Sequence, residues 1–518
     1  MESIQLEQPK DLFWQRGLTA LILGSFIFRV YILINPLNEP SYQLLFSLLY
    51  MSAAVYALQR RAFREQTGFR LILPCFLWAL LCCALHPYEE REVMHLASYV
   101  LMMVFAFFVC YPQAFLWPER VGQRALNVVA GGYLALICGL SIVGVYAALS
   151  GSSVPSLAGP GFVPAVFSTG RLSLFCYPTI SSTFCCLALL LGLYLALACP
   201  SPLSRALCIL AMLPPFAALA LTDSRTSCAF FSACFGGFCF LLAKDRLSLR
   251  KPIAAIALSL CIAAAGVACA FGGLRLVYKT ITTVSSQVLS AGQSAPSPDL
   301  SSPALSSSSI GEAVALSAQP GAFAHASQAD GDQPEPAPSQ ANGGEPRSLL
   351  ENFSTFQGRT YAWEGALRAL KAQPRLLLFG SSPLFVMEAV EPYIDKLYND
   401  VPFVHLHSIF FQTLVSYGLP GLLLFGALMG YILFHGLRLF FLGGKGCTLA
   451  QRALPLLLFF CMAVDLLEIF LTFSDVMKHS NPWFFLVAGY VVRLSITRIP
   501  SRKTETRQEA LSKEPSMP

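Results

Sequence analysis

The sequence predicts an all-α protein that crosses a membrane about twelve times, and three observations support this fold class. Of the 518 residues, 55% are hydrophobic and only 12% are charged, whereas about 25% are charged in soluble proteins. The mean hydropathy is +0.59. The apolar runs reach the ~20 residues that a helix needs to cross a bilayer. A soluble globular protein is therefore excluded, and a net charge of +6 is too mild to indicate nucleic-acid binding.

Twelve apolar runs are candidate membrane spans. Their length argues against a β-barrel, whose strands alternate in polarity over about ten residues. Glycine and proline within the runs are compatible with membrane helices. We expect the spans at residues 17–35, 42–58, 70–86, 95–111, 125–149, 177–199, 206–222, 226–243, 252–272, 418–440, 454–473 and 483–499.

Lysine and arginine gather in alternate loops, which predicts the orientation of the spans. One set of loops is strongly basic, and residues 60–70, 244–251 and 493–513 are examples. The opposite short loops hold only Arg91, Arg171, Arg225 and Lys478. Because basic residues favour cytoplasmic loops, we expect both termini in the cytoplasm. A second span directly follows the first, so we expect the first to be a retained helix and not a signal peptide.

The spans divide the chain into regions. We expect an N-terminal membrane region at 1–272, an external loop at 273–417, a C-terminal membrane region at 418–499 and a cytoplasmic tail at 500–518. Within the loop, residues 285–347 are rich in Ser, Ala, Pro and Gly, and this composition predicts disorder. Residues 349–417 regain helical periodicity and should pack on the membrane region. None of the 17 cysteines lies in the external loop, so we expect no disulfide framework and no metal site.

Four residues on the expected outer side are candidates for binding or catalysis. Arginine on this side goes against the orientation rule, and its guanidinium matches the geometry of phosphate oxygens. Arg225 either binds an anion or pairs with Asp223, and Arg359 either binds an anion or belongs to a solvated charged face. Arg171 either binds substrate or anchors the next span at the interface. His407 titrates near neutral pH and can act as a base.

Three further residues form a second tier. His405 lies two residues before His407, so the two side chains should diverge, and a pair of interfacial histidines without a catalytic role is the alternative. Asp465 and Glu468 lie three residues apart and should share one helix face. Acidic residues inside a membrane are functional candidates by default, although an ion pair that orients an arginine or lines a wet vestibule is the structural alternative.

Several motifs resemble those of the O-antigen ligase and polymerase superfamily. "HSIFFQTLVSYGLPGLLLF" (407–425) resembles its signature of a histidine followed by Gly-x-x-Gly at the start of a helix, with Ser408 where the family usually has Asn. "LTDSRTSCAFF" (221–231) is similar to its Ser-Arg motif. "GRTYAWEGALRALKAQPRLLLFGSS" (358–382) is similar to its Arg-x(3)-Trp element, which ends in a Gly-rich turn. "GRLSLFCYPTISSTFCCLALLL" (170–191) is similar to a further family stretch but lacks the usual Asn-Pro-Asn.

The resemblance implies a function in polysaccharide biosynthesis for the bacterial cell envelope. It implies a GT-C-like glycosyltransferase of the cytoplasmic membrane that works by inversion, without a metal or other cofactor. Its substrates would be an undecaprenyl-pyrophosphate-linked glycan and a glycan or lipid acceptor at the outer face, with membrane lipids as a further partner and the oligomeric state left open. By the resemblance, Arg225 and Arg359 would grip the pyrophosphate and His407 would be the catalytic base.

Two alternatives stay open at this point. Within the resemblance, a ligase that moves a finished chain to a new acceptor and a polymerase that joins repeat units are both compatible with the sequence. Outside it, the chain would be a non-catalytic glycolipid transporter or flippase. A flippase should show an internal repeat and charged residues along a path through the membrane, whereas the polar residues here cluster at the outer ends of the expected spans.

Overall fold

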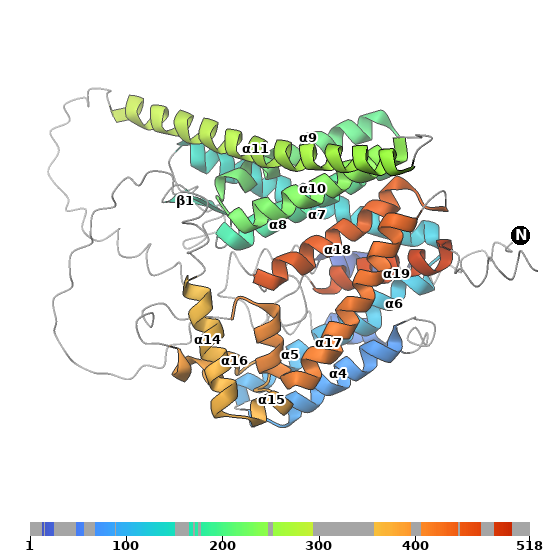
Figure 1. The fold of residues 1–518 in the computed structure, drawn as a ribbon, viewed down its shortest axis with the longest axis vertical. Coiled ribbons are helices and arrows are strands. Elements are labelled where there is room, and N and C mark those ends of the chain that lie inside the picture. Colours follow the sequence, from blue (N-terminus) through green and yellow to red (C-terminus); the bar gives the residue numbers. More distant parts are fainter. Residues whose placement is uncertain are drawn as a thin grey trace, which may run out of the picture.

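The structure is a computed structural model that describes residues 13–14, 16–24, 48–55, 58, 68–88, 90–150, 165–168, 171–174, 178–246, 252–293, 357–394, 406–443, 446–467 and 481–499. Within these ranges the chain is almost entirely helical (Figure 1). The two described strands, β1 (Ala165–Ser168) and β2 (Arg171–Leu174), form one antiparallel hairpin. The predicted all-α polytopic membrane fold is therefore confirmed.

The helices follow the expected spans from the third span onward. Eight helices of the described residues are long and apolar enough to cross a membrane. The first two spans are described only in part, in the helical stretches 16–24 and 48–55, so a total of twelve stays a prediction. The helices are α4 (Phe69–Ala84), α5 (Glu90–Val104), the π-helix η2 (Phe105–Cys110), α6 (Tyr111–Leu116), α7 (Glu119–Ser150), α8 (Pro178–Ala198), α9 (Pro202–Leu221), α10 (Arg225–Arg246), α11 (Pro252–Gln293), α14 (Gln357–Ala372), α15 (Arg375–Phe379), α16 (Val386–Val390), the 3-10 helix η4 (Glu391–Tyr393), α17 (Ile409–Leu442), α18 (Leu449–Leu467) and α19 (Asn481–Arg498).

Two helices differ from the expected boundaries. Helix α11 continues to Gln293, beyond the expected span end at 272, and so includes the first residues of the segment 285–347 that was expected to be disordered. The remainder of that segment lies outside the described residues. Helix α17 begins at Ile409, before the expected start at 418, but its backbone is non-helical at Gly418, with φ 68° and ψ −174°. The expected span therefore coincides with the part of α17 that follows this break.

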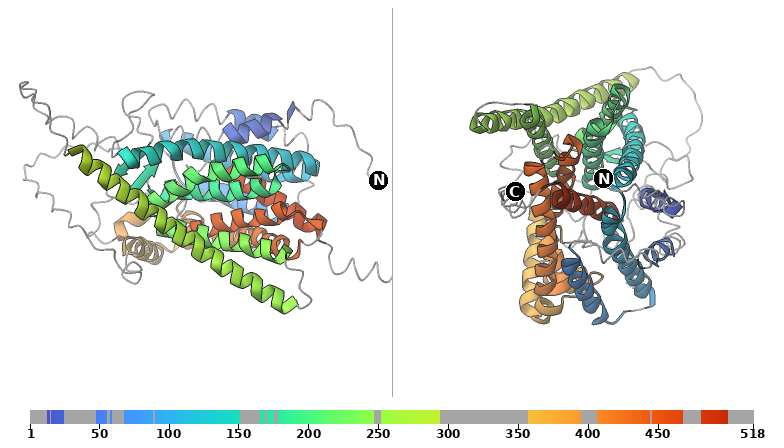
Figure 2. Two further views of the ribbon diagram at one scale, coloured as in Figure 1. Left: turned by 90° about the horizontal axis from the view of Figure 1, so that it is seen from above. Right: turned by 90° about the vertical axis from the view of Figure 1, so that its right-hand side faces the viewer.

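Helix α18 joins two groups of helices. On one side α18 packs against α8 and α10, and on the other against α17 and α19. Helices α7–α11 lie together in the upper half of Figure 1, and α4 and α17 lie with α14–α16 in the lower half. Figure 2 shows α11 running obliquely across the edge of the bundle. Because lipid is as apolar as leucine, close packing rather than hydrophobic transfer holds such helices together.

Two basic side chains donate hydrogen bonds to carbonyl groups at helix C-termini, on the side of the bundle where the basic loops are expected. Lys244 Nζ donates to the carbonyl of Phe441 at 2.8 Å, and Arg438 donates to the carbonyl of Ile499 at 2.8 Å. The last carbonyls of a helix lack intrahelical donors and carry the negative end of its dipole. These cations therefore stabilise helix ends as well as following the orientation rule.

At the break in α17, two backbone turns come into close contact. Gly380, after α15, has φ 69°, and Gly418 has φ 68°. A Cβ on Gly418 would lie against the carbonyl of Leu378, and one on Gly380 against the carbonyl of Ser416, both closer than 3.0 Å. Glycine is therefore required at both positions, by conformation and by space.

A side chain of α4 and a backbone N–H of the turn after α15 donate hydrogen bonds to carbonyl groups near the break in α17. Trp78 on α4 donates its Nε1–H to the carbonyl of Tyr417 at 2.8 Å. The N–H of Ser381 donates to the carbonyl of Val415 at 2.7 Å. Tyr88 and Ser382 share a further hydrogen bond of 2.8 Å. The external helices α14–α16 are thereby fixed to the start of a membrane helix.

Replacing Gly418 with alanine should destabilise the protein by about 2–4 kcal/mol, because the new Cβ adds backbone strain and a clash with Leu378. The midpoint of thermal unfolding in detergent measures this. Gly426→Ala is the matched control: it lies in the same helix, and a Cβ there would meet no atom within 4 Å. Equal midpoints for the two variants would contradict the proposed role of the contact.

Candidate functional site

The turn between α9 and α10 carries the first group of predicted site residues. Asp223 in this turn has φ 46°, a left-handed conformation, and Arg225 is the first residue of α10. Arg171 begins strand β2, and its Nε donates to the carbonyl of Thr222 at 3.1 Å. The β-hairpin thus brings Arg171 to the same turn as Arg225, although the two residues are far apart in sequence.

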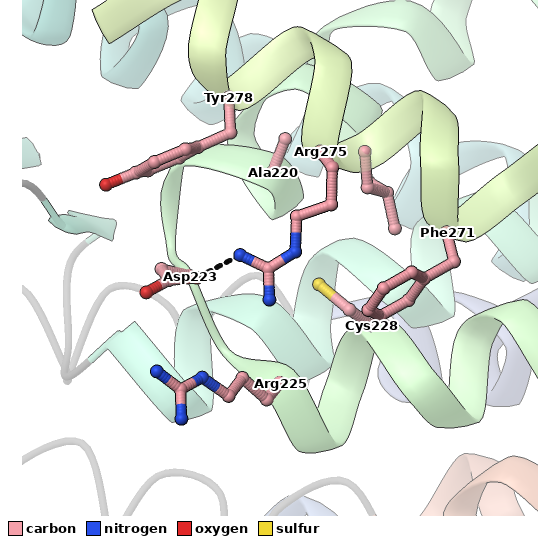
Figure 3. A pocket seen from close by; sticks show the side chains of 8 residues that line it. Ala220, Asp223, Arg225, Cys228, Phe271, Arg275 and Tyr278 are labelled. Atoms are coloured by element: carbon pink, nitrogen blue, oxygen red, sulfur yellow. Dashed lines mark hydrogen bonds and ion pairs between the residues drawn. The ribbon is translucent and has the colours of Figure 1, made fainter. Parts of the chain in front are cut away.

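A pocket opens beside this turn, between α9, α10 and α11 (Figure 3). Arg275 of α11 reaches across it to Asp223, with 3.4 Å between Nη1 and Oδ1. The guanidinium of Arg275 also lies 5.5 Å from the ring centre of Phe271, a cation–π distance. The lining residues are Ala220, Asp223, Arg225, Cys228, Phe271, Leu274, Arg275 and Tyr278.

The ion pair of this turn does not involve Arg225. Asp223, one of the acids that could have paired with Arg225, pairs with Arg275 instead. Among the described residues, no carboxylate forms an ion pair with Arg225, which is exposed at the pocket. The N-terminal end of α10 adds the positive end of a helix dipole. Three arginines and one carboxylate therefore surround this turn, an arrangement that favours an anion with several oxygen atoms.

The second group of site residues lies where α14 meets the start of α17. Trp363 of α14 donates its Nε1–H to the carbonyl of Leu406 at 2.7 Å. Its ring stacks on Phe411, with 5.6 Å between ring centres and 18° between planes. Arg359 lies four residues before Trp363, on the same face of α14. The Arg-x(3)-Trp element is thus brought beside the residue that precedes His407.

The two residues of chemical interest in this group have distinctive surroundings. Burial lowers the pKa of the Arg359 guanidinium, which nevertheless keeps its charge because arginine titrates far above neutral pH. His407 is half-buried and has φ 50°. It lies two residues before Ile409, the first residue of α17. A histidine in a left-handed conformation and a partly buried guanidinium therefore belong to the two elements that meet here.

The two groups lie on the same side of the bundle but in different places. Figure 1 shows the hairpin strand β1 and helix α14 at the same end of the helices. The pocket lining contains Arg225 but neither Arg359 nor His407. The structure thus brings Arg171 to the turn before Arg225, and it brings α14, the helix of Arg359, to the residue before His407. It does not bring all four residues into this pocket.

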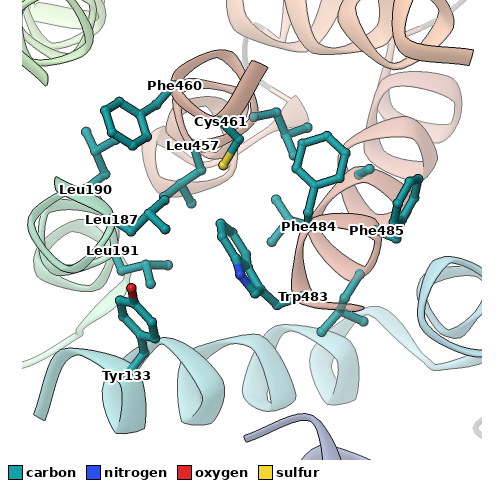
Figure 4. Packing of buried hydrophobic residues seen from close by; sticks show 14 of the residues in the cluster. Tyr133, Leu187, Leu190, Leu191, Leu457, Phe460, Cys461, Trp483, Phe484 and Phe485 are labelled. Carbon is teal, nitrogen blue, oxygen red and sulfur yellow. The ribbon is translucent and has the colours of Figure 1, made fainter. Parts of the chain in front are cut away.

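Of the three second-tier residues, Asp465 alone lies within the described residues. Asp465 is 1% exposed on α18, one turn after Cys461, which Figure 4 shows in the core between α8, α18 and α19. Its predicted neighbour Glu468 lies outside the described residues, as does His405. Whether Asp465 and Glu468 share a face therefore stays a prediction.

Sequence reasoning missed two residues of these groups. Arg275 lies within α11, just after the expected end of the span at 272, so the orientation signal that singled out Arg225 applies to it as well. Trp363 was part of the motif for the resemblance but had no assigned role. Its contact with Leu406 joins segments 43 positions apart, and no local pattern predicts such a pair.

Comparison with known families gives one match. Residues 209–426 match the family described as "O-Antigen ligase". The matched region runs from within α9 to within α17 and contains Arg225, Arg275, Arg359 and His407. No curated protein matches the chain. The match confirms the resemblance to the O-antigen ligase and polymerase superfamily over residues 209–426 of this membrane protein.

Proposed function

We propose that the chain is a glycosyltransferase of the bacterial cytoplasmic membrane, with both termini in the cytoplasm and its active site at the outer face. It transfers a glycan from an undecaprenyl-pyrophosphate-linked donor to an acceptor hydroxyl, as a polysaccharide ligase or a repeat-unit polymerase. The family match supports an enzyme of the glycosyltransferase type that acts on lipid-linked glycans. The donor, the acceptor and the roles of single residues are part of the proposal.

The observation that carries the proposal is the arginine-lined pocket inside the matched domain. Arg225 and Arg275 line it, and Arg171 holds the turn from the other side. A pyrophosphate carries several oxygens that guanidinium groups bind in pairs. Negative charge grows on this group as the glycosidic bond breaks, so fixed cations here stabilise the transition state.

The surroundings of the pocket suit a donor that is polar at one end only. Leu276 directly follows Arg275 and is 67% exposed, and Leu210 on α9 is 61% exposed. Exposed leucines on membrane helices face lipid. The polyprenyl tail of the donor can therefore stay among the acyl chains while its pyrophosphate reaches the arginines.

The proposed reaction is a single displacement at the anomeric carbon. The acceptor oxygen forms a bond to that carbon while the bond to the pyrophosphate oxygen breaks, which inverts the configuration. The Nε2 or Nδ1 atom of His407 takes the hydroxyl proton, and polyprenyl pyrophosphate leaves with the electron pair. In this proposal Arg359, on the helix that contacts the residue before His407, also contributes to binding the pyrophosphate of the donor. In this mechanism the arginines supply the positive charge, so the proposal is for transfer without a metal.

The second-tier residues keep a supporting role in the proposal. Asp465 is buried on α18, and a carboxylate there can orient an arginine or line a wet vestibule. We assign the same supporting role to His405 and Glu468.

Replacing His407 with alanine should lower the rate of glycan transfer at least ~100-fold, the usual contribution of a general base. Binding of the lipid-linked donor should change less than about threefold. Transfer is measured with purified protein in liposomes, and binding with a prenyl-pyrophosphate analogue. His86→Ala is the control, since His86 lies beside Phe385 in the same external region and has no assigned role. A His407→Ala enzyme with full activity would refute the base assignment.

Replacing Arg225 with alanine should weaken binding of a prenyl-pyrophosphate analogue about tenfold or more, because charge-assisted hydrogen bonds to phosphate are lost. Arg225→Lys should weaken binding less than Arg225→Ala does, because lysine keeps the positive charge but lacks the paired donors of the guanidinium. Lys279→Ala removes an exposed cation of α11, four residues after Arg275, that does not line the pocket, and it should leave affinity unchanged. If Lys279→Ala weakened binding as much as Arg225→Ala, general surface charge rather than this pocket would explain the affinity.

A further inference from the structure

His407 has a backbone conformation that L-residues rarely adopt. Its φ is 50°, while the next residue, Ser408, is extended with φ −156°. A left-handed conformation is unfavourable for a residue with a Cβ. Such a conformation persists only where the surrounding structure determines it, and it often occurs at functional sites. The question is which groups determine it here.

The residue before His407 is held from two sides. The carbonyl of Leu406 accepts the Nε1–H of Trp363 at 2.7 Å, and the N–H of Leu406 donates to Oε1 of Gln412 at 3.2 Å. Leu406 is fully buried. Both hydrogen bonds stabilise this arrangement of the segment and so offset the strain at His407.

The two side chains that hold Leu406 are themselves fixed. Trp363 stacks on Phe411, and Gln412 is 4% exposed within α17, where its N–H donates to the carbonyl of Ser408 at 2.9 Å. Ala362 and Ala366 lie near Trp363 on α14 and are fully buried. Their small side chains allow α14 to pack closely against the neighbouring helices α16 and α17. One hydrogen bond therefore comes from α14 and the other from α17, and both end on the same peptide segment.

We propose that Trp363 and Gln412 are positioning residues that set the direction of the His407 imidazole during transfer. The inference rests on the proposed role of His407 as the base. Loss of either hydrogen bond lets the segment 406–408 relax toward an ordinary backbone conformation, which moves the imidazole away from the acceptor hydroxyl. A displacement of about 1 Å at a reacting group lowers the rate by up to ~100-fold, while the binding of the donor, which depends on the arginines, is unaffected.

Trp363→Phe tests this directly, because phenylalanine keeps an aromatic ring that can stack on Phe411 but has no N–H donor for Leu406. We expect kcat for glycan transfer to fall about 10- to 100-fold, with KM for the lipid-linked donor within about twofold of the original. The midpoint of thermal unfolding in detergent should change little. Lys371→Ala is the control for α14: its side chain is exposed on the same helix, and kcat should not change.

Gln412→Met provides a second variant in case Trp363→Phe folds poorly, since it removes the acceptor for the Leu406 N–H at nearly constant volume. It should show the same loss of kcat at constant KM. An unchanged kcat in both variants, or an effect on KM alone, would overturn the positioning role while leaving His407 as the base. An active His407→Ala enzyme would instead overturn the proposed function, whatever the result for Trp363→Phe.

Discussion

The contact between the turns at Gly380 and Gly418 is the constraint on which the external part of the molecule depends. Two backbones approach so closely there that neither position has room for a Cβ. The break frees the carbonyl of Tyr417, which Trp78 of α4 satisfies. A membrane helix, an external turn and a second membrane helix are thereby joined at one point. The start of α17, and with it the segment around His407, takes its place from this junction.

Charge is the second organising factor, and it works differently at the two ends of the bundle. At the basic end, Lys244 and Arg438 bind carbonyls at helix termini. At the opposite end, Arg275 pairs with Asp223, and Arg225 stays exposed at the pocket. A cation that closes a helix is structural, whereas one exposed beside an apolar, lipid-facing surface suits an amphipathic anion. This contrast separates Arg225 from Lys244 and Arg438.

Much of the fold could be predicted from the sequence because membrane helices are set by a local property, the length of an apolar run. The expected spans at 177–199 and 206–222 match α8 and α9 within a few residues. The extension of α11 to Gln293 was not predictable, since its last turns are no longer apolar enough to indicate a span. The pairing of Asp223 with Arg275 and of Trp363 with Leu406 also escaped prediction, because each joins elements that meet only after the helices have packed.

The central claim is that the chain breaks and forms a glycosidic bond rather than moving a glycolipid unchanged. Reconstitution of the purified full-length protein in liposomes with a lipid-linked oligosaccharide and a candidate acceptor tests it most directly. The account predicts release of polyprenyl pyrophosphate in step with glycan appearing on a longer chain or on the new acceptor. Translocation of an intact lipid-linked oligosaccharide, with no pyrophosphate released, would contradict the account and favour a transporter.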